Sequence, residues 1–171
     1  MKPLALLTAG FVGMAVATGA FAAGGGTTTT TKTCKGGQVY DKKTKKCMDP
    51  SQAGNDAIYE TAMGLAYGGK YQAAIDLLVL ARDQNDPRIL NYLGFSHRKM
   101  GKTQEAMVFY TKALEIDPNY SLARSYMGQG MVADGDYVGA RKQLAEIAAR
   151  GDEGSWPYVM LKNAILSGTT Y

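Results

Sequence analysis

The chain has 171 residues, of which 46% are hydrophobic and 20% charged, and its formal net charge is +4. The positive charge is concentrated in residues 32–47, which hold six lysines against one aspartate, whereas residues 48–171 hold twelve lysines and arginines against fourteen acidic residues. Because that larger part is slightly acidic, the overall charge does not support a nucleic-acid-binding domain, and we expect no nucleic-acid partner.

Residues 1–22 have the form of a secretory signal peptide. Lys2 precedes an apolar run over residues 4–22 that ends in Ala20, Phe21 and Ala22, a small-x-small cleavage pattern. The pattern predicts export with cleavage after Ala22. An uncleaved membrane anchor is the alternative, because the run is nearly long enough to cross a bilayer, although glycines and threonines dilute it. Residues 23–33 are rich in glycine and threonine and are expected to form a flexible linker.

Two cysteines define the next segment. Cys34 and Cys47 are the only cysteines in the chain, and they bracket a polar stretch that indicates two short strands around a turn. In an exported protein an isolated pair is most simply a disulfide. Closing a loop of this length contributes about 3 kcal/mol in the chain-entropy model. We therefore expect a disulfide-closed β-hairpin over residues 34–48, followed by a linker over residues 49–54.

The turn of this hairpin carries Lys42, Lys43, Lys45 and Lys46. Clustered cations favour contact with an anionic cell-wall polymer, a lipid head group or an acidic protein. The alternative is a solvated turn whose lysines protect short strand edges from pairing with other strands. The sequence leaves both interpretations open.

From residue 55 onward a pattern repeats every 34 residues, which is typical of a stacked helical array. Small residues at Gly94 and Ala106 mark positions where two helices of one hairpin approach closely. The pattern of the central unit and its recurrence in the following unit are Leu93, Gly94, Gly101, Ala106, Tyr110 and Ala113, then Met127, Gly128, Gly135, Ala140, Leu144 and Ile147.

These residues resemble the tetratricopeptide repeat, and residues 87–118 match its motif at nearly every defining position, except that His97 stands where the family usually has tyrosine. The register gives repeat one over 55–86, repeat two over 87–120 and repeat three over 121–154, with a capping helix over 155–167 and a tail over 168–171. Repeat one is two residues shorter than the family period. The resemblance implies an all-α fold, a right-handed superhelix of three helix hairpins with a C-terminal capping helix, preceded by the small β-hairpin.

The resemblance also implies that the first helix of each unit lines a concave face that recognises partners. Aromatic and adaptable side chains at these positions suit a groove for an extended peptide or a partner helix. The alternative is that several of them, notably Met63 and Phe95, pack between units. The expected contact residues are Tyr59, Glu60, Met63, Tyr67, Asn91, Tyr92, Phe95, Arg98, Lys99, Tyr126 and Gln129.

No catalytic constellation is evident. His97 is the only histidine, and it occupies a packing position rather than standing beside a nucleophile. Asp134 and Asp136 flank Gly135 without the further oxygen ligands of a calcium loop, so they indicate a turn between helices. We expect no catalytic residues, no cofactor and no metal site.

The sequence therefore predicts a non-enzymatic scaffold or adaptor, similar to bacterial periplasmic proteins of this repeat family, that binds a segment of another envelope protein in its concave groove. The alternative is a structural envelope protein, attached to an anionic cell wall or membrane surface through the lysine-rich hairpin, whose repeats self-associate. The identity of the partner does not follow from the scaffold, because one fold presents different surfaces to different ligands.

Overall fold

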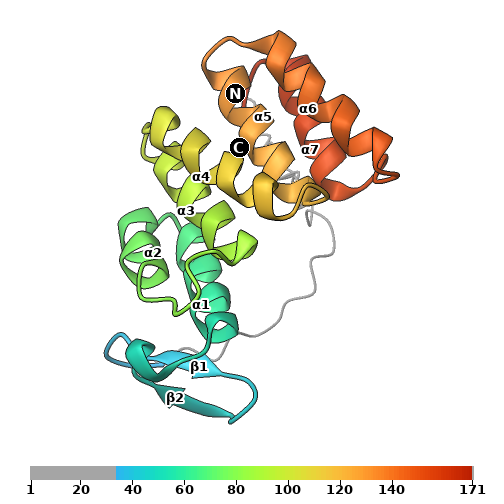
Figure 1. Cartoon of the computed structure of the whole chain (residues 1–171). Coiled ribbons are helices and arrows are strands. Elements are labelled where there is room, and N and C mark those ends of the chain that lie inside the picture. The colour runs from blue at the N-terminus through green and yellow to red at the C-terminus, as the bar shows by residue number, and fades with distance from the viewer. Residues whose placement is uncertain (1–33, 171) are drawn as a thin grey trace, which may run out of the picture. The chain divides into compact units, whose positions relative to one another are not determined.

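The computed structural model describes residues 34–170. The predicted leader and linker, together with Tyr171, lie outside the described residues. The helices and strands follow one another along the chain as shown by colour in Figure 1. They are β1 (Val39–Asp41), β2 (Lys46–Met48), the short 3-10 helix η1 (Pro50–Gln52), α1 (Asn55–Tyr67), α2 (Tyr71–Leu78), α3 (Pro87–Lys99), α4 (Thr103–Ile116), α5 (Ser121–Ala133), α6 (Tyr137–Ala149) and α7 (Trp156–Ser167).

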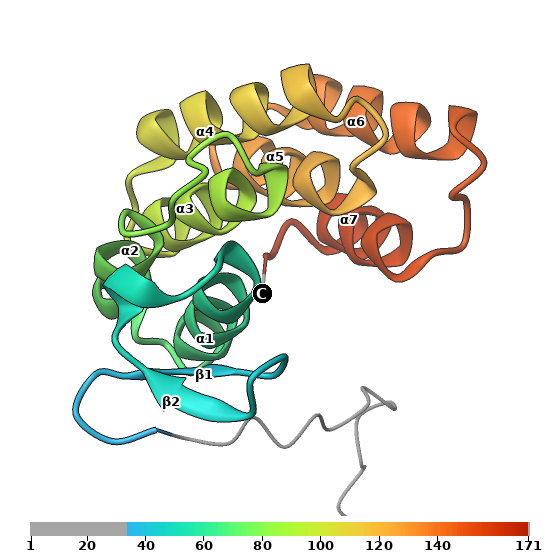
Figure 2. The same ribbon diagram turned by 60° about the horizontal axis from the view of Figure 1, so that its bottom comes forward.

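The described part of the chain is a helical superhelix preceded by a two-stranded hairpin, as predicted. Helices α1 and α2, α3 and α4, and α5 and α6 form three antiparallel pairs, and α7 packs against α5 and α6. Figure 2 shows α3, α5 and α7 side by side, with α4 and α6 on their outer side. The buried residues form three clusters: the largest runs from the β-hairpin through α1–α4 to Tyr126 of α5, a second lies among α5, α6 and α7, and a small third one joins α3, α4 and α5.

The hairpin is closed by the predicted disulfide between Cys34 and Cys47, whose Cα atoms are 5.7 Å apart. Its strands are antiparallel, with Val39 opposite Met48. Val39 is fully buried in the same apolar cluster as Ile58 of α1, and Met48 packs against that cluster. The hairpin therefore shares the core of the first helix pair.

Repeat one departs from the other two where the chain is short. Helix α2 has eight residues and ends at Leu78, and Ala81 is buried although it lies beyond the helix. The side chain of Gln84 folds back, and its Nε2 donates hydrogen bonds to the carbonyl oxygens of Leu78, Val79 and Ala81 at 3.2, 3.2 and 2.7 Å. These bonds satisfy carbonyl groups that the shortened helix leaves without helical partners.

Local signals in the sequence explain where three helices begin. Asp86 caps α3 by accepting a hydrogen bond from the Arg88 backbone N–H at 2.9 Å, and Pro87 follows as the first helical residue. Asp136 caps α6 in the same way through Gly139 at 2.8 Å. Ser155 caps α7. Asp136 therefore serves as a helix cap.

Small residues allow the helices of neighbouring elements to touch. A Cβ atom on Gly94 of α3 would lie 2.6 Å from Cε1 of Tyr110 in α4, closer than real Cβ atoms approach a neighbour. Gly128 of α5 also has a close neighbour, but it is Leu161 of α7 rather than a residue of its partner helix α6, with a Cβ contact of 2.7 Å. The two glycines are 34 residues apart, so the same repeat position allows a close approach in both units, although the helix approached differs.

No helix within residues 34–170 is both long enough and apolar enough to cross a membrane.

Replacing Gly94 with alanine is expected to destabilise the protein by about 1–3 kcal/mol, because the added methyl overlaps the buried Tyr110 ring. The control is Gly64→Ala in α1, where the new Cβ would meet no atom within 4 Å. That change should be neutral or stabilise by up to about 1 kcal/mol, since alanine favours a helix. Urea unfolding followed by circular dichroism measures both. Equal stability of the two variants would contradict the proposed close approach.

Candidate protein-binding surface

The first helices of the pairs meet through an aromatic cluster, defined here as Tyr59, Tyr67, Tyr92, Phe95 and Tyr126. The ring of Tyr92 in α3 lies 5.5 Å from Tyr59 and 5.9 Å from Tyr67 in α1. The ring of Phe95 in α3 lies 4.9 Å from Tyr126 in α5. The contacts of Tyr92 with both α1 tyrosines have the edge-to-face geometry that aromatic pairs favour. The cluster therefore joins α1, α3 and α5 directly.

Three hydroxyl groups of this cluster form a hydrogen-bonded chain. The Tyr92 hydroxyl donates to the Tyr67 oxygen at 2.9 Å, and the hydroxyls of Tyr67 and Tyr126 lie 2.8 Å apart. Burial raises the pKa of Tyr92 well above its usual range, and Tyr67 raises it further. The Tyr92 hydroxyl therefore remains neutral at physiological pH, and the chain of three hydroxyls links three consecutive repeats.

Six of the predicted contact residues are buried. Each has 7% or less of its surface exposed: Asn91, Tyr92, Phe95, Arg98, Tyr126 and Gln129. The reason is that successive first helices pack on one another, so side chains expected to line a groove lie between repeats. These six side chains are therefore not open in the described structure, and Phe95 packs between units as the alternative has it; whether a partner contacts any of the six stays a prediction.

The other predicted contact residues are more accessible. Tyr67 is half exposed, and Tyr59, Glu60, Met63 and Lys99 are partly buried. Glu60 forms an ion pair with Lys42 of the hairpin turn. Burial lowers the pKa of Lys99, and the neighbouring charge of Arg98 lowers it further. A partner approaching α1 and α3 would meet these side chains before the buried ones.

Several buried polar atoms on α3 and α5 have no hydrogen-bond partner within residues 34–170. They include Oδ1 of Asn91, Oε1 of Gln129, and Nε and Nη2 of Arg98. An unsatisfied buried polar group costs about 1–3 kcal/mol, and more when it is charged. These atoms come from positions that the repeat pattern assigned to the concave face. The face thus retains hydrogen-bonding capacity that the described residues do not use.

Arg98 is the most unusual of these groups. Its guanidinium carbon lies 5.6 Å from the centre of the Phe95 ring and 5.9 Å from that of Tyr126, so aromatic faces stabilise its charge. Burial raises the pKa of Tyr110 to about 12, and the nearby Arg98 charge opposes this increase. No acidic side chain among the described residues forms an ion pair with Arg98. A buried guanidinium without a carboxylate is a site of unbalanced positive charge.

His97 has the packing position predicted for it. Its ring stacks on Phe109 of α4 with centroids 5.3 Å apart and an angle of 26°. Burial lowers its pKa, and the charge of Lys102 lowers it further. The ring is therefore neutral at physiological pH and serves as a partly buried aromatic spacer between α3 and α4.

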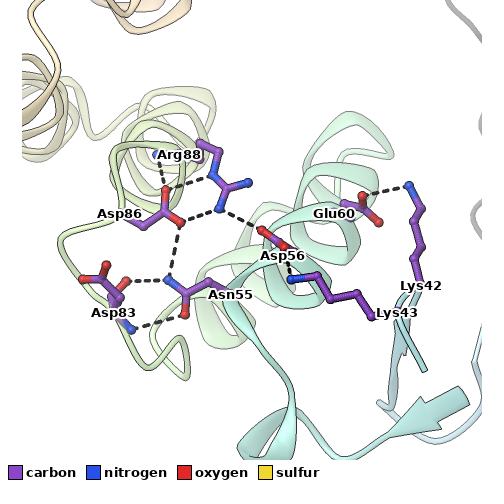
Figure 3. A network of polar contacts seen from close by, with 8 residues as sticks. All are labelled: Lys42, Lys43, Asn55, Asp56, Glu60, Asp83, Asp86 and Arg88. Carbon is purple, nitrogen blue, oxygen red and sulfur yellow. Dashed lines mark hydrogen bonds and ion pairs between the residues drawn. The ribbon is translucent and has the colours of Figure 1, made fainter. Parts of the chain in front are cut away.

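A charged network joins the hairpin to the start of the superhelix (Figure 3). Lys43 pairs with Asp56 at 2.9 Å, and the other Asp56 oxygen lies 3.0 Å from Nη2 of Arg88. Arg88 also pairs with Asp86 at 2.7 Å. Asn55 joins this network by donating to Asp86 at 3.5 Å. A single exposed ion pair contributes at most about 1 kcal/mol to stability. This network differs from a single pair because Asp56 pairs with both Lys43 and Arg88, and Arg88 pairs with both Asp56 and Asp86.

The network shifts the pKa values of two carboxyl groups. Hydrogen bonds from Lys43 and then Arg88 lower the pKa of Asp56. Burial acts to raise the pKa of Asp86, but hydrogen bonds from Arg88 outweigh it, and the pKa falls below its usual value. The charged form of both carboxyl groups is therefore more stable in the folded protein than in the unfolded chain.

The lysines of the hairpin turn divide into two groups. Lys42 and Lys43 form ion pairs with Glu60 and Asp56 of α1, whereas Lys45 and Lys46 are exposed. From the sequence alone, the four lysines of the turn form one candidate contact site for an anionic surface. Two of them thus have acidic partners within the chain, because α1 presents Asp56 and Glu60 next to the turn.

Two clefts border the hairpin. One, of about 420 Å³, lies over the charged network and is lined by Asp41, Lys43, Asp56 and Arg88 among others. The second, of about 700 Å³, lies between the hairpin and α1–α2 and is lined by Gly64 of α1 and Gly68 just after it, among others. Within residues 34–170 no group of three histidine, cysteine, aspartate or glutamate side chains is arranged to hold a metal ion.

Helix α7 corresponds to the predicted capping helix, and it also carries exposed apolar residues that were not among the predicted contact residues. Trp156, Val159 and Leu166 are 50%, 41% and 75% exposed. They lie 34 residues after Leu122, Ser125 and Val132 of α5, which repeat the first-helix positions. The signal that reveals them is the same 34-residue period, continued one unit further.

The three helix pairs, the close glycine contacts and the paired first helices define a protein of stacked helical hairpins. Within it, residues 87–120 match the family model described as Tetratricopeptide repeat. The chain thus carries a tetratricopeptide repeat at its centre, in a superhelix of the tetratricopeptide type. Repeats of this family indicate a protein–protein interaction scaffold and are generally non-catalytic.

A curated relative is the protein named "Probable biofilm formation methyltransferase WspC" of Pseudomonas aeruginosa. It is 38% identical over 63 residues, which are 37% of this chain and 15% of the relative. Because the matched stretch is such a small part of that protein, the similarity concerns one segment rather than the whole relative.

The charged network predicts a dependence of stability on pH. Asp86→Asn keeps a side-chain oxygen for the α3 cap but removes the charge that binds Arg88. It should cost about 1–2 kcal/mol at pH 7. Asp86 and Asp56 have folded pKa values below the unfolded value of about 3.9, so their stabilisation is present above about pH 4 and is lost as the pH falls further.

The difference between wild type and Asp86→Asn should therefore shrink as the pH is lowered below about 4. Urea unfolding between pH 7 and pH 2 measures it. Asp134→Asn is the control, because Asp134 is exposed and has no ion pair within residues 34–170. A difference that stays constant with pH would show that the Asp86 charge does not stabilise the fold.

Proposed function

We propose that this protein is a non-enzymatic adaptor of the bacterial cell envelope that binds an acidic segment of another protein on the face formed by α1, α3 and α5. The observation that carries the proposal is the buried guanidinium of Arg98, which forms no ion pair within residues 34–170 and whose Nε and Nη2 have no hydrogen-bond partner there, accompanied by the unsatisfied side-chain oxygens of Asn91 and Gln129. A polypeptide segment supplies the matching groups, since its carboxylates accept from arginine and its backbone N–H groups donate to amide oxygens.

The charge of this region favours an acidic segment. Arg98 and Lys99 are adjacent at the end of α3, and neither forms an ion pair within residues 34–170. A carboxylate brought to a buried guanidinium gains strong hydrogen bonds and relieves an uncompensated charge. The accessible side chains Tyr67, Met63 and Lys99 give the segment its first contacts. As the acidic segment moves further in, it contacts Arg98 and the side-chain amides of Asn91 and Gln129.

The proposed location rests on two features. Residues 1–22 have the form of an export signal. The Cys34–Cys47 disulfide is a bond that persists in oxidising compartments such as the bacterial periplasm. Together they support a periplasmic adaptor whose partner is another envelope protein; the proposal includes cleavage of the leader after Ala22, as the small-x-small pattern predicts.

A second candidate function is attachment to an anionic cell-wall or membrane surface through the hairpin. The exposure of Lys45 and Lys46 favours it, because these two lysines are not used in ion pairs with α1. Only half of the predicted basic cluster is then available, so we rank this function below groove binding. It is tested by Lys45→Gln combined with Lys46→Gln.

The binding test uses crosslinking in intact cells, purification of the protein and mass spectrometry of the crosslinked peptides. Arg98→Gln combined with Lys99→Gln should reduce recovery of one dominant partner by about tenfold or more, because charge-assisted hydrogen bonds of about 1.5–3 kcal/mol are lost. The crosslinked segment should be acidic. Tyr92 and Tyr126 are unsuitable probes, since both are buried and their truncation would destabilise the fold.

The matched control is Lys112→Gln with Arg141→Gln, which removes two positive charges from exposed positions on α4 and α6. This variant should recover the partner as wild type does. Unchanged recovery in the Arg98 and Lys99 variant would disprove the proposed groove. Loss of cell-wall or lipid crosslinks in the Lys45 and Lys46 variant would support surface attachment instead.

A further inference from the structure

Helix α7 has two apolar faces. Leu161 and Ala164 are buried where the helix packs against α5 and α6. On the opposite side of the helix, Trp156, Val159 and Leu166 are exposed, Leu166 by as much as 75%. A helix that only closes a repeat stack is expected to have a polar outer face. The outer face of α7 departs from that expectation.

The exposed face has the pattern of a seam between two helices. Trp156, Val159, Asn163 and Leu166 are separated by three, four and three residues, which is the narrow a/d stripe of a two-helix coiled coil. None of the four carries a charge. Lys162 is the only charged residue in α7, and it lies at the edge of the stripe. The surface is therefore suited to a second apolar helix.

We propose that this stripe on α7 binds α7 of a second copy of the chain, so that the protein forms a two-fold symmetric dimer. A two-fold interface must be self-complementary, with the same patch on both copies. Asn163 meets this requirement, because an amide is both donor and acceptor and pairs with its own counterpart at an a position. Two parallel stripes also bring Trp156 and Leu166 against their own counterparts.

Charge agrees with a second copy as the occupant. In a parallel pair of such helices the edge residue Lys162 lies nearest to the residue five positions later in the other copy, which is the uncharged Ser167. Like charges are thus kept apart. An acidic segment, which suits Arg98 and Lys99, finds no matching cluster of cations along this stripe. The inference is independent of the proposed groove, since it uses a different helix and different residues.

The dimer is expected to be weak. A helix of twelve residues is about 18 Å long, and interfaces below about 1,200 Å² are characteristic of transient complexes. The concentration series in any test must therefore extend to roughly 1 mM, where complexes with very weak affinity are still populated.

The chain offers a built-in probe, because Trp156 is its only tryptophan. Light scattering after size-exclusion chromatography measures the mass of the purified full chain, and fluorescence measures the emission maximum of Trp156. We expect the mass to rise from that of a monomer to that of a dimer with concentration. The emission should shift to shorter wavelength over the same range as the ring becomes buried.

Leu166→Glu should keep the monomer mass and a constant emission maximum at all concentrations, because two carboxylates would enter an apolar seam. Val138→Glu is the matched control: Val138 is 74% exposed on α6, so the same charge is added outside the stripe, and dimerisation should persist. Circular dichroism verifies that both variants fold. Val159→Lys provides a second, independent disruption of the stripe.

Three outcomes would overturn the proposal. The wild type stays monomeric up to roughly 1 mM; or it dimerises equally well with Leu166→Glu and Val159→Lys; or Trp156 emits at short wavelength in a monomer at every concentration. The last result would mean that another segment of the same chain covers the stripe.

Discussion

The structure depends on the direct packing of the first helices on one another. In this stack α3 is central, and every residue from Ile89 to Ser96 is buried, so nearly all sides of the helix are enclosed. Tyr92 and Phe95 reach rings on both neighbouring first helices, and the hydroxyl chain through Tyr67 adds directional contacts to the apolar ones. A single repeat cannot bury these surfaces, and the units are therefore stable only together. The same packing bears on the proposed function, because it buries several of the predicted contact residues and encloses the Arg98 guanidinium within the stack.

Much of the fold could be predicted from the sequence because its signals are local and repeated. Gly94 and Gly128 mark close helix contacts at one period, Asp86 with Pro87 marks a helix start, and an isolated cysteine pair marks a disulfide. Burial on the inner face could not be predicted in the same way. It depends on how far successive first helices are rotated and shifted against one another, and a difference of one position decides whether Tyr126 faces solvent or Phe95. Periodicity assigns a residue to a face of its helix but does not say how closely the next helix covers that face.

The contacts of the hairpin with the helices could not be predicted from the sequence either. Its strands and disulfide follow from local composition, but its role depends on partners far along the chain. Val39 enters the core beside Ile58, and Lys43 in the hairpin turn pairs with Asp56 of α1, which also pairs with Arg88 of α3. The lysine cluster was interpreted as an outward-facing patch because its acidic partners on α1 are not adjacent in sequence. Once those pairs are formed, the hairpin covers the outer side of α1, where a solenoid would otherwise expose apolar surface. It acts as a cap built from strands and held by a covalent bond.

The apolar surfaces beside α1 and at α7 therefore differ in whether the described chain covers them. Beside α1, an apolar surface is closed within the chain by Val39 and Met48 and by the ion pairs of the turn. At α7, the apolar stripe of Trp156, Val159 and Leu166 remains exposed in the described structure, with an asparagine in its centre. Exposed apolar surface in contact with water is costly unless it is used for binding. The asymmetry favours assembly at α7, and it leaves the region around Arg98 available for a different partner.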